Sequence, residues 1–322
     1  MAARIAFITG IAGFAGSWLA EELCAHGYTV FGSLYENEPT DNLETCRSDV
    51  ELLPMDVTQP DQVHKALKKT GPHYVFHLAA LAAVGKSFES ERLTYRVNLE
   101  GTLNVLKAAA ELDRLKKLVC VSSSDAYGLF KPKNKTLTED QPLNPVSPYG
   151  ISKAAAEHLC RSYRRRTKLP VTIARSFNHA GPRQAENFVI PDFARQVAAI
   201  ELGRQKPIMK TGNLTPRRDF SDVRDIVRGY RLLAEKGEPG SVYQLCSGRA
   251  TEVRRVLQIL TGFASKPIRV TTDAGKKRSV EIPVVRGSNA RAVQELGYEI
   301  RYTLRRTLRE TYDYWLEQLR NR

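Results

Sequence analysis

Residues 4–16 read RIAFITGIAGFAG, an apolar run that ends in three glycines, Gly10, Gly13 and Gly16, spaced three positions apart. A helix-length apolar segment follows at residues 17–25. A strand, a glycine turn and a helix in this order are typical of a dinucleotide-binding unit, because glycines let backbone amides and a helix N-terminus approach a pyrophosphate. We therefore expect these residues to form the first βα unit of such a fold.

The first 175 residues alternate between apolar, strand-like runs and helical segments. Strands are expected at 4–9, 29–32, 51–55, 74–77, 118–122 and 171–175, and helices at 62–69, 99–112 and 154–167. This alternation predicts an α/β fold of the Rossmann type, with a doubly wound parallel sheet between two helical layers. It defines a dinucleotide-binding domain of residues 1–175, to which about 218–244 return.

From Ser176 onward the pattern changes to loops rich in Asn, Gly and Pro. We expect a smaller C-terminal lobe here, made of residues 176–217 and 245–322, which would bind the substrate. Helices are expected at 222–233, 252–260 and 302–319.

A second informative stretch is Ser147-Pro-Tyr-Gly-Ile-Ser-Lys153, which precedes a helix-forming run. On a helix, Tyr149 and Lys153 are one turn apart and share a face. Alone, a phenol titrates near ~10 and an amine near ~10.4, so neither is a useful acid or base at neutral pH. A cation held beside a phenol favours the phenolate, and we therefore expect Lys153 to lower the pKa of Tyr149 toward the working range.

Composition excludes several classes of protein. The 322 residues are 42% hydrophobic and 26% charged, and no apolar run approaches the ~20 residues that span a bilayer. Five scattered cysteines without C-x-x-C spacing predict free thiols and no metal site. The formal net charge of +14 is spread along the chain, which favours small polyanionic ligands over nucleic acid. We expect a cytoplasmic protein with no membrane or nucleic-acid partner.

The combination of T-G-x-x-G-F-x-G near the N-terminus and Y-x-x-x-K about 135 residues later resembles the extended short-chain dehydrogenase/reductase superfamily of NAD-dependent epimerases and dehydratases. Further landmarks of that family are Asp56-Val57, the run His77-Leu-Ala-Ala80, Asn98 and the serine triplet that ends at Ser124. The resemblance implies an NAD(P)-dependent enzyme that acts on a nucleotide sugar. It also suggests a homodimer.

Site residues follow from this resemblance, position by position. Ser123 would hydrogen-bond the reacting sugar oxygen, Tyr149 would exchange a proton with it, and Lys153 would hold the nicotinamide ribose. The implied cofactor-binding residues are Gly10, Gly13, Phe14, Ala15, Gly16, Ser33, Asp56, Val57, Leu78, Ala79, Ala80, Tyr149, Lys153, Phe177 and His179.

Asp125 bears on the reaction type. Sugar 4,6-dehydratases that resemble this chain carry a glutamate at this position, two residues before Tyr127-Gly128, where it removes the C5 proton. An aspartate is one methylene shorter, and a shift near 1 Å can cost ~100-fold where alignment sets the rate. Asp125 is therefore a candidate catalytic residue that disfavours dehydration, and orientation of Ser123 is an equally good role for it.

The second half resembles GDP-sugar enzymes, above all the GDP-6-deoxy-D-mannose reductases. The segments that carry this likeness are FNHAGP at 177–182, NFVIPDFARQ at 187–196, GNLTPRRDFSDVRD at 212–225 and CSG at 246–248. The implied substrate-binding residues are Asn178, Phe188, Val189, Arg195, Asn213, Arg218, Arg278 and Glu281. Ser279 stands where the family often has proline.

The resemblance implies NADP(H)-dependent reduction of the C4 ketone of GDP-4-keto-6-deoxy-D-mannose to GDP-D-rhamnose. Alternatives are a GDP-mannose 4,6-dehydratase, a UDP-sugar 4-epimerase and a non-catalytic sensor of NADP(H). NADP(H) is preferred, with NAD(H) possible, because the predicted second strand ends without an Asp. No arginine stands immediately beside that position, as it does in many NADP-dependent relatives.

Overall fold

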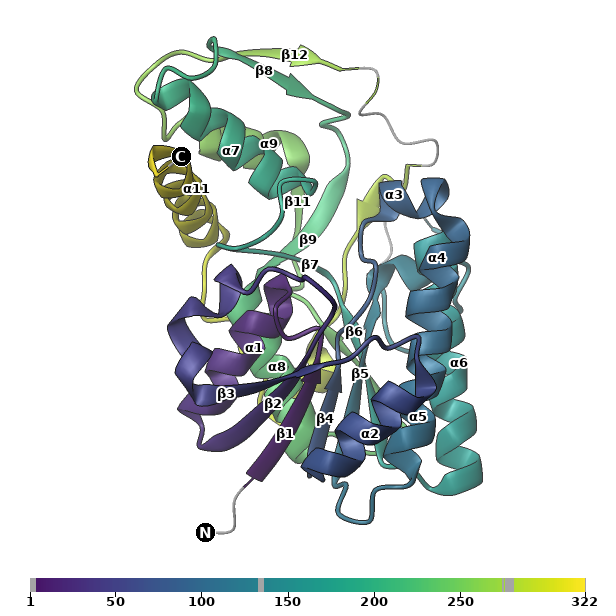
Figure 1. The fold of residues 1–322 in the computed structure, drawn as a ribbon. Coiled ribbons are helices and arrows are strands. Elements are labelled where there is room, and N and C mark those ends of the chain that lie inside the picture. The colour runs from purple at the N-terminus through teal and green to yellow at the C-terminus, as the bar shows by residue number, and fades with distance from the viewer. Residues whose placement is uncertain (1–3, 133–135, 274, 276–280, 322) are drawn as a thin grey trace.

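The computed structural model describes residues 4–132, 136–273, 275 and 281–321. Its central sheet has seven parallel strands in the order β10-β6-β5-β4-β1-β2-β3 (Figure 1). The strands are β1 (Arg4–Thr9), β2 (Tyr28–Leu34), β3 (Val50–Pro54), β4 (Tyr74–His77), β5 (Lys117–Ser123), β6 (Val171–Ser176) and β10 (Val242–Leu245). The strand order reverses between β1 and β4, and ligands of such sheets bind at the carboxyl ends of the strands beside that point. The predicted Rossmann fold is confirmed.

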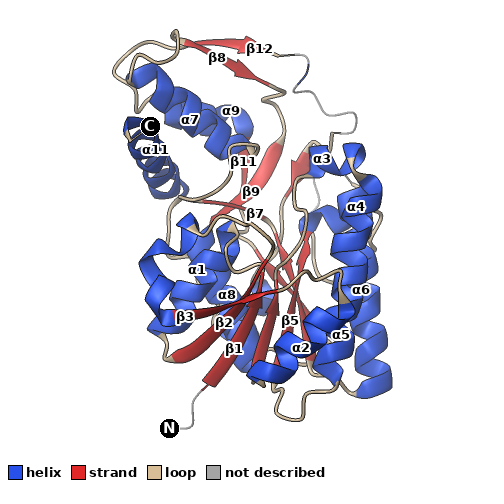
Figure 2. Ribbon diagram, viewed as in Figure 1, coloured by secondary structure: helices blue, strands red, loops and turns tan. Residues whose placement is uncertain are grey.

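Helices cover both faces of this sheet (Figure 2). On one face lie α1 (Phe14–Ala25) and α8 (Val223–Lys236), and on the other α2 (Pro60–Thr70), α5 (Gly101–Ala110) and α6 (Pro148–Thr167). Ile8 packs toward α1 and α8, whereas its neighbour Phe7 packs toward the opposite layer. Strands buried on both faces are apolar throughout, which is why the sequence revealed them.

The predicted helix at 154–167 begins earlier than expected, at Pro148. Ser147 caps it by accepting a hydrogen bond from the Gly150 amide, and Pro148 occupies the first turn, where its missing N–H costs nothing. Tyr149 therefore lies in the first turn of α6.

The predicted helix at 99–112 is present as α5 (Gly101–Ala110), and a π-helical turn precedes it. The structure has α3 (Val84–Glu89), α4 (Glu91–Tyr95), a π-helical turn η2 (Arg96–Glu100) and then α5. Single π turns inside helices insert one residue and are frequent at functional sites.

Most elements of the second half of the chain form a second layer above the carboxyl edge of the sheet in Figure 1. Strands β7 (Asn178–Ala180), β9 (Arg217–Asp222), β11 (Ala250–Glu252) and β13 (Val284–Val285) make one small sheet, and β8 (Ile208–Thr211) pairs with β12 (Arg269–Thr272). Helices α7 (Val189–Glu201), α9 (Val253–Thr261) and α11 (Leu304–Arg320) share an apolar core that includes Phe193, Val256 and Leu308.

Two segments differ from the predicted lobe boundaries. Residues 218–222 were expected to return to the dinucleotide-binding domain, but they belong to β9 in the small upper sheet. Helix α10 (Ala290–Leu296) was expected in the C-terminal lobe, but Ala292, Leu296 and Tyr298 are buried in the same core as α1 and α8. Their apolar side chains pack against the helices that cover the sheet and not against the upper layer.

Two short 3-10 segments complete the description, η1 (Asp41–Asp49) and η3 (Ser124–Ala126). All five cysteines are free, and all but Cys24 are buried, as predicted. Among the helices of the described residues, none combines the length and apolar character needed to cross a bilayer.

Candidate active site

The glycine turn between β1 and α1 is tightly packed. Gly10 has a φ of 70°, and a Cβ there would lie 3.0 Å from the Cα of Ala79. A Cβ on Gly16 would lie 2.1 Å from the carbonyl oxygen of Gly10. Gly13 is the N-cap of α1, followed by Phe14 and Ala15 in its first turn. This is a cradle that only glycine can form, and it leaves the N-terminus of α1 open to an anionic group.

A buried hydrogen-bond cluster locks the ends of β1 and β4 together. The Thr9 hydroxyl is 2.8 Å from His77 Nδ1 and accepts hydrogen bonds from the amides of Leu78 and Ala79, both at 3.1 Å. Burial, aided by the Lys153 ammonium, lowers the pKa of His77 to about 3. His77 is therefore neutral at pH 7. Its hydrogen bond to Thr9 helps to fix the carboxyl ends of β1 and β4, and it has no role as a proton carrier.

The structure brings the three predicted catalytic side chains together. Ser123 ends β5, and Tyr149 and Lys153 face it from the first turns of α6. Lys153 Nζ donates a hydrogen bond to the Val121 carbonyl at 2.9 Å and lies 5.9 Å from the centre of the Tyr149 ring. The Tyr149 hydroxyl is hydrogen-bonded to Ser123. All three side chains are at least nine-tenths buried.

The prediction that Lys153 lowers the pKa of Tyr149 is wrong for this structure. Burial raises the pKa of Tyr149 well above its usual value, the Asp125 carboxylate raises it further, and the hydrogen bond with Ser123 opposes both. Burial also lowers the pKa of Lys153. Desolvation penalises any charged form, and it is the largest cause of both shifts. Tyr149 is therefore protonated at neutral pH, the form required of a proton donor.

Asp125 is bound to Ser123 in two ways. The Ser123 hydroxyl donates to Asp125 Oδ2, and the Asp125 amide donates to the Ser123 Oγ, both at 3.1 Å. This reciprocal pair fixes the rotamer of Ser123 beside Tyr149. The orienting role considered for Asp125 is the one that these contacts support.

A buried ion pair lies behind the catalytic side chains and was missed in the sequence. Arg175 on β6 makes two hydrogen bonds of 2.7 Å to the carboxylate of Glu157 on α6, and Ser122 on β5 donates to the same carboxylate at 2.7 Å. Glu157 lies two turns beyond Tyr149 on the same face of α6. The sequence could have revealed this residue, because a carboxylate two helical turns after Tyr149 must face the interior and therefore needs a buried partner.

Asn98 ties the π-helical turn to α6. Its Oδ1 accepts a hydrogen bond from the Leu81 amide at 2.8 Å, and its Nδ2 donates to the Ser152 hydroxyl at 3.0 Å. Ser152 in turn donates to the Tyr149 carbonyl at 2.7 Å. The turn thereby reaches the backbone of the catalytic helix through one buried amide.

Several predicted cofactor residues have side chains in the interior. Ser33 is 3% exposed and its Oγ accepts a hydrogen bond from the Gly10 amide at 2.9 Å. Val57 packs beneath Gly101, and Phe177 packs on Tyr127. Any contact of these three with a ligand would therefore use the backbone.

Other predicted cofactor residues are more accessible. Leu78, Ala79 and Ala80 are partly exposed where β4 ends. The His179 ring stacks on Phe14 at 5.8 Å between centroids, which joins the glycine turn to β7. Asp56 Oδ1 accepts a hydrogen bond from the Thr58 amide at 2.8 Å and so shapes the turn after β3.

Three predicted substrate-binding residues meet in the upper layer. Glu281 Oε2 accepts a hydrogen bond from Asn213 Nδ2 at 3.0 Å, and its Oε1 lies 3.4 Å from an Arg218 guanidinium nitrogen. Arg218 also donates to the Ile282 carbonyl at 2.7 Å. Glu281 is 68 positions from Asn213 and 63 from Arg218 in sequence, so their meeting supports a common site. Arg278 lies outside the described residues.

The remaining predicted substrate residues lie near the start of α7 and on β7. Phe188 is the N-cap of α7 and Val189 its first residue, and both are partly exposed. Arg195 forms an ion pair of 2.7 Å with Glu186 in the preceding loop. Asn178 is exposed on β7, beside β9.

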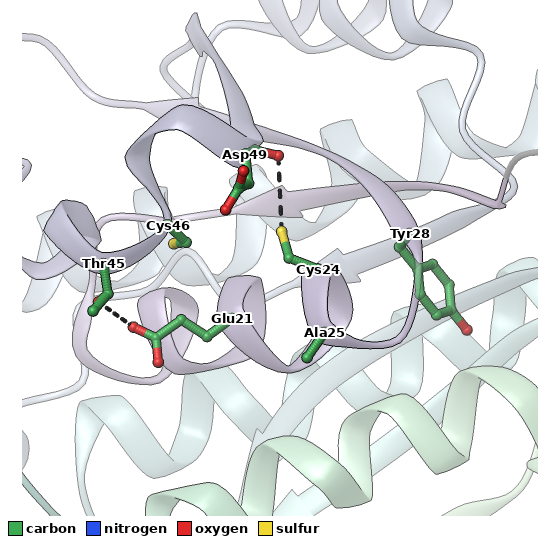
Figure 3. Close-up of a pocket in the computed structure, with 7 residues that line it drawn as sticks. All are labelled: Glu21, Cys24, Ala25, Tyr28, Thr45, Cys46 and Asp49. Atoms are coloured by element: carbon green, nitrogen blue, oxygen red, sulfur yellow. Dashed lines mark hydrogen bonds between the residues drawn. The ribbon is translucent and has the colours of Figure 1, made fainter.

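A separate surface pocket lies between α1 and η1, and no predicted site residue lines it (Figure 3). Its two thiols, Cys24 and Cys46, have pKa values raised to about 11, chiefly by burial. Thiols of such high pKa are poor nucleophiles at neutral pH. Among the described residues, no group of three His, Cys, Asp or Glu side chains is placed to hold a metal ion.

Comparison with known proteins agrees with this geometry. The family model described as GDP-mannose 4,6 dehydratase matches residues 7–311. A GDP-6-deoxy-D-mannose reductase of Pseudomonas aeruginosa is 31% identical, with 98% of each chain covered. A GDP-mannose 4,6-dehydratase of Sinorhizobium fredii is 32% identical over 79% of this chain and 75% of its own.

Solved structures give the same picture. RMD from Pseudomonas aeruginosa, complexed with NADPH, superposes with a TM-score of 0.84 at 32% identity, covering 98% of this chain and 99% of its own. A UDP-glucose 4-epimerase of Thermus thermophilus, in complex with NAD, superposes with a TM-score of 0.85 at 28% identity, covering 97% and 98%.

Proposed function

The chain belongs to the GDP-mannose 4,6 dehydratase family of nucleotide-sugar enzymes, and on that premise we propose that it reduces the C4 ketone of GDP-4-keto-6-deoxy-D-mannose to GDP-D-rhamnose. The observation that carries the proposal is the buried cluster of Ser123, Tyr149 and Lys153 at the end of β5 and the start of α6. A reductase needs a proton donor beside the ketone, and a phenol that stays protonated meets that need.

The glycine cradle and the open N-terminus of α1 fit a dinucleotide pyrophosphate. A reduced nicotinamide, when bound, would supply the hydride for C4. The Tyr149 hydroxyl gives its proton to the C4 oxygen as the C=O π bond opens, and solvent then reprotonates the phenolate. Ser123 positions that oxygen, and the Lys153 ammonium offsets the transient negative charge on Tyr149.

The GDP moiety would lie against the upper layer. Arg218, in partnership with Asn213 and Glu281, would bind the diphosphate and ribose, since an arginine fork suits phosphate oxygens. Arg278, Asn178, Phe188, Val189 and Arg195 belong to the same proposal, as does assembly into a homodimer.

The test is incubation of purified protein with the keto sugar and either reduced dinucleotide. The expected result is matched consumption of dinucleotide and ketone, with GDP-D-rhamnose as product. No consumption of either reactant would reject the proposal. The molar mass of the protein, measured by light scattering as it elutes from a size-exclusion column, tests the homodimer separately.

The second candidate is GDP-mannose 4,6-dehydratase activity, which the family match and the identity to such enzymes favour. Asp125 argues against it, because its carboxylate is engaged with Ser123. Water loss from GDP-mannose without added reductant would support the dehydratase. Interconversion of a UDP-sugar without net redox change would indicate a 4-epimerase instead.

NADP(H) was the dinucleotide favoured in the sequence, with NAD(H) as the alternative. One relative of known structure is complexed with NADPH and another with NAD, so similarity to relatives does not decide between the two dinucleotides.

A further inference from the structure

Three helices on one face of the central sheet, α2, α5 and α6, end at the edge where the strands begin (Figure 1). Each leads into the next strand of the parallel sheet, and hydrogen bonds place the connecting loops side by side. The Lys116 amide donates to the His73 carbonyl at 2.8 Å, and the Leu118 amide donates to the Pro170 carbonyl at 3.0 Å. Three separate parts of the sequence therefore form one continuous edge, opposite the proposed catalytic residues.

This edge is rich in side chains that carry positive charge, and we call the following set the basic edge. It consists of Lys65, Lys68 and Lys69 on α2, Arg114 and Lys116 after α5, and Arg164, Arg165, Arg166 and Lys168 at the end of α6. All of them are exposed except Arg164, which is half-buried. The cations that are spread along the sequence are therefore brought together by the fold.

The end of α6 does not need all of this charge. Cations near the last carbonyls of a helix complement its dipole. Arg164 fills that role, because its guanidinium donates to the Lys168 carbonyl at 2.7 Å. Arg166 stacks over the Tyr163 ring, 4.6 Å from its centroid. Among the described residues, no carboxylate forms an ion pair with Arg165 or with the Lys168 ammonium.

The carboxylates along the basic edge offset little of its charge. Glu51 lies 3.8 Å from the Lys69 ammonium, and Glu111 lies 3.2 Å from the His64 ring. All four side chains are exposed, so solvent weakens both contacts. Asp113 is the other carboxylate of the loop after α5. The edge therefore keeps a net positive charge.

The length of β5 separates the basic edge from the proposed catalytic residues. From Lys117 to Ser123 the strand rises about 20 Å, at ~3.3 Å per residue. A partner on this edge would therefore leave the dinucleotide and the sugar free to enter. Sites for single-stranded nucleic acid combine cations with exposed aromatic rings. Tyr163, the ring at the end of α6, is buried, whereas a charged lipid surface requires only exposed cations.

We propose that the basic edge docks this protein on a membrane surface that carries anionic phospholipids. Clusters of about four to eight Lys and Arg side chains bind such surfaces by charge alone. Docking of this kind involves the lipid headgroups and needs no helix that crosses the bilayer. The inference departs from the expectation, made on the sequence, that the protein has no membrane partner. It goes beyond the proposed function and does not rest on it.

Sedimentation of the full-length protein with phospholipid vesicles tests this directly. At low ionic strength, the affinity for phosphatidylcholine vesicles with about 30% phosphatidylglycerol is expected to be roughly tenfold or more above that for phosphatidylcholine alone. Added salt should weaken the binding, because the Debye length falls from ~30 Å at 0.01 M to ~10 Å at 0.1 M. Equal binding to both kinds of vesicle, or binding to neither, would overturn the proposal.

The double variant Lys116→Gln/Arg165→Gln removes one exposed cation from each of two neighbouring loops. Its affinity for the anionic vesicles is expected to fall roughly tenfold. Arg204→Gln/Lys206→Gln makes the same change in net charge at exposed positions after α7, in the upper layer, and should keep the affinity of the wild-type protein. Equal losses in the two double variants would show that net charge alone drives the binding, and would overturn the assignment to this edge.

A second pair on α2 gives an independent measurement. Lys65→Gln/Lys68→Gln is expected to lower the affinity for anionic vesicles by a similar factor, and an unchanged affinity would remove α2 from the docking surface. A single-stranded RNA oligonucleotide serves as the competitor. Tighter binding of RNA than of vesicles, lost in the same variants, would overturn the choice of a membrane as partner.

Docking and catalysis can be tested apart. Dinucleotide affinity, measured by nicotinamide fluorescence, should be the same with and without vesicles, because the two surfaces lie at opposite edges of the sheet. Vesicle binding without reduction of the keto sugar would reject the proposed reaction and leave the docking surface intact. Reduction of the sugar by a protein that does not bind anionic vesicles would reject the docking surface alone.

Discussion

The proposed catalytic cluster at the sheet edge and the proposed nucleotide-sugar residues of the upper layer are held in place by different means. Tyr149 and Lys153 are buried, and Lys153 is hydrogen-bonded to the backbone of β5. Arg218 and Glu281 are less buried and hold each other through a longer contact of 3.4 Å. Groups that move protons need fixed geometry, whereas groups that release a product need partners that can exchange.

The sharpest test of this contrast is Tyr149→Phe. Removal of the proton donor is expected to lower kcat by roughly 10²–10⁴-fold, while dinucleotide binding stays nearly unchanged because the phenyl ring still fills the same space. Single-turnover kinetics and fluorescence titration measure the two effects. Full activity in this variant would dismiss the mechanism, because another group would then have to donate the proton.

The buried region should also be the acid-sensitive one. The pKa of His77 is lowered to about 3 from 6.5, so the unfolded chain binds this proton more readily than the folded chain. Above about pH 6.5 His77 is neutral in both the folded and the unfolded chain, so it causes no pH dependence of stability there. As pH drops from 6.5 toward 3, only the unfolded chain takes up the proton, and the free energy of unfolding should fall by roughly 1.4 kcal/mol per pH unit.

Urea denaturation at several pH values measures this slope. His77→Gln should flatten it, and His158→Gln, at an exposed position on α6, should not. Equal slopes in the wild-type protein and in His77→Gln would contradict the assignment.

A change in the upper layer should affect substrate affinity more than turnover. Arg218→Met removes charge-assisted hydrogen bonds to the proposed diphosphate, and KM for the keto sugar should rise roughly 10- to 100-fold with kcat nearly constant. Arg217→Met is the matched control, since Arg217 is exposed and donates to the Ala250 carbonyl. A large loss of kcat in Arg218→Met would show that the two regions are not separate in function.

The smallest expected effect is a shift in a pH profile. The Asp125 carboxylate raises the pKa of Tyr149, so Asp125→Asn should lower that pKa. Because the phenol acts in its protonated form, the alkaline fall in kcat should move to lower pH by about one unit or less. An unmoved alkaline limb would mean that Asp125 acts on Ser123 alone.

The same contrast explains how much could be predicted from the sequence. Strands β1 and β4 have the predicted bounds, because strands buried on both faces are apolar throughout. Ser123, Tyr149 and Lys153 meet as predicted, because a regular strand and helix carry them.

The missed features depend on packing that no local pattern encodes. The pair of Glu157 and Arg175 needs α6 to lie against β6, and the placement of α10 follows from the shape of the core it completes. The direction of the Tyr149 pKa shift was missed for a related reason. Spacing reveals a neighbouring charge, but it does not reveal the depth of burial.

The π-helical turn at 96–100 has a consequence for chain length. Deleting one residue there would restore a regular α-helix and rotate α5 by about 100° relative to α4. Thr102 would turn away from His77 Nε2, which it now approaches at 3.0 Å, and Val105 and Leu106 would leave the sheet. The surplus residue therefore sets the phase of the whole helix, and any shortening of this turn would misalign it.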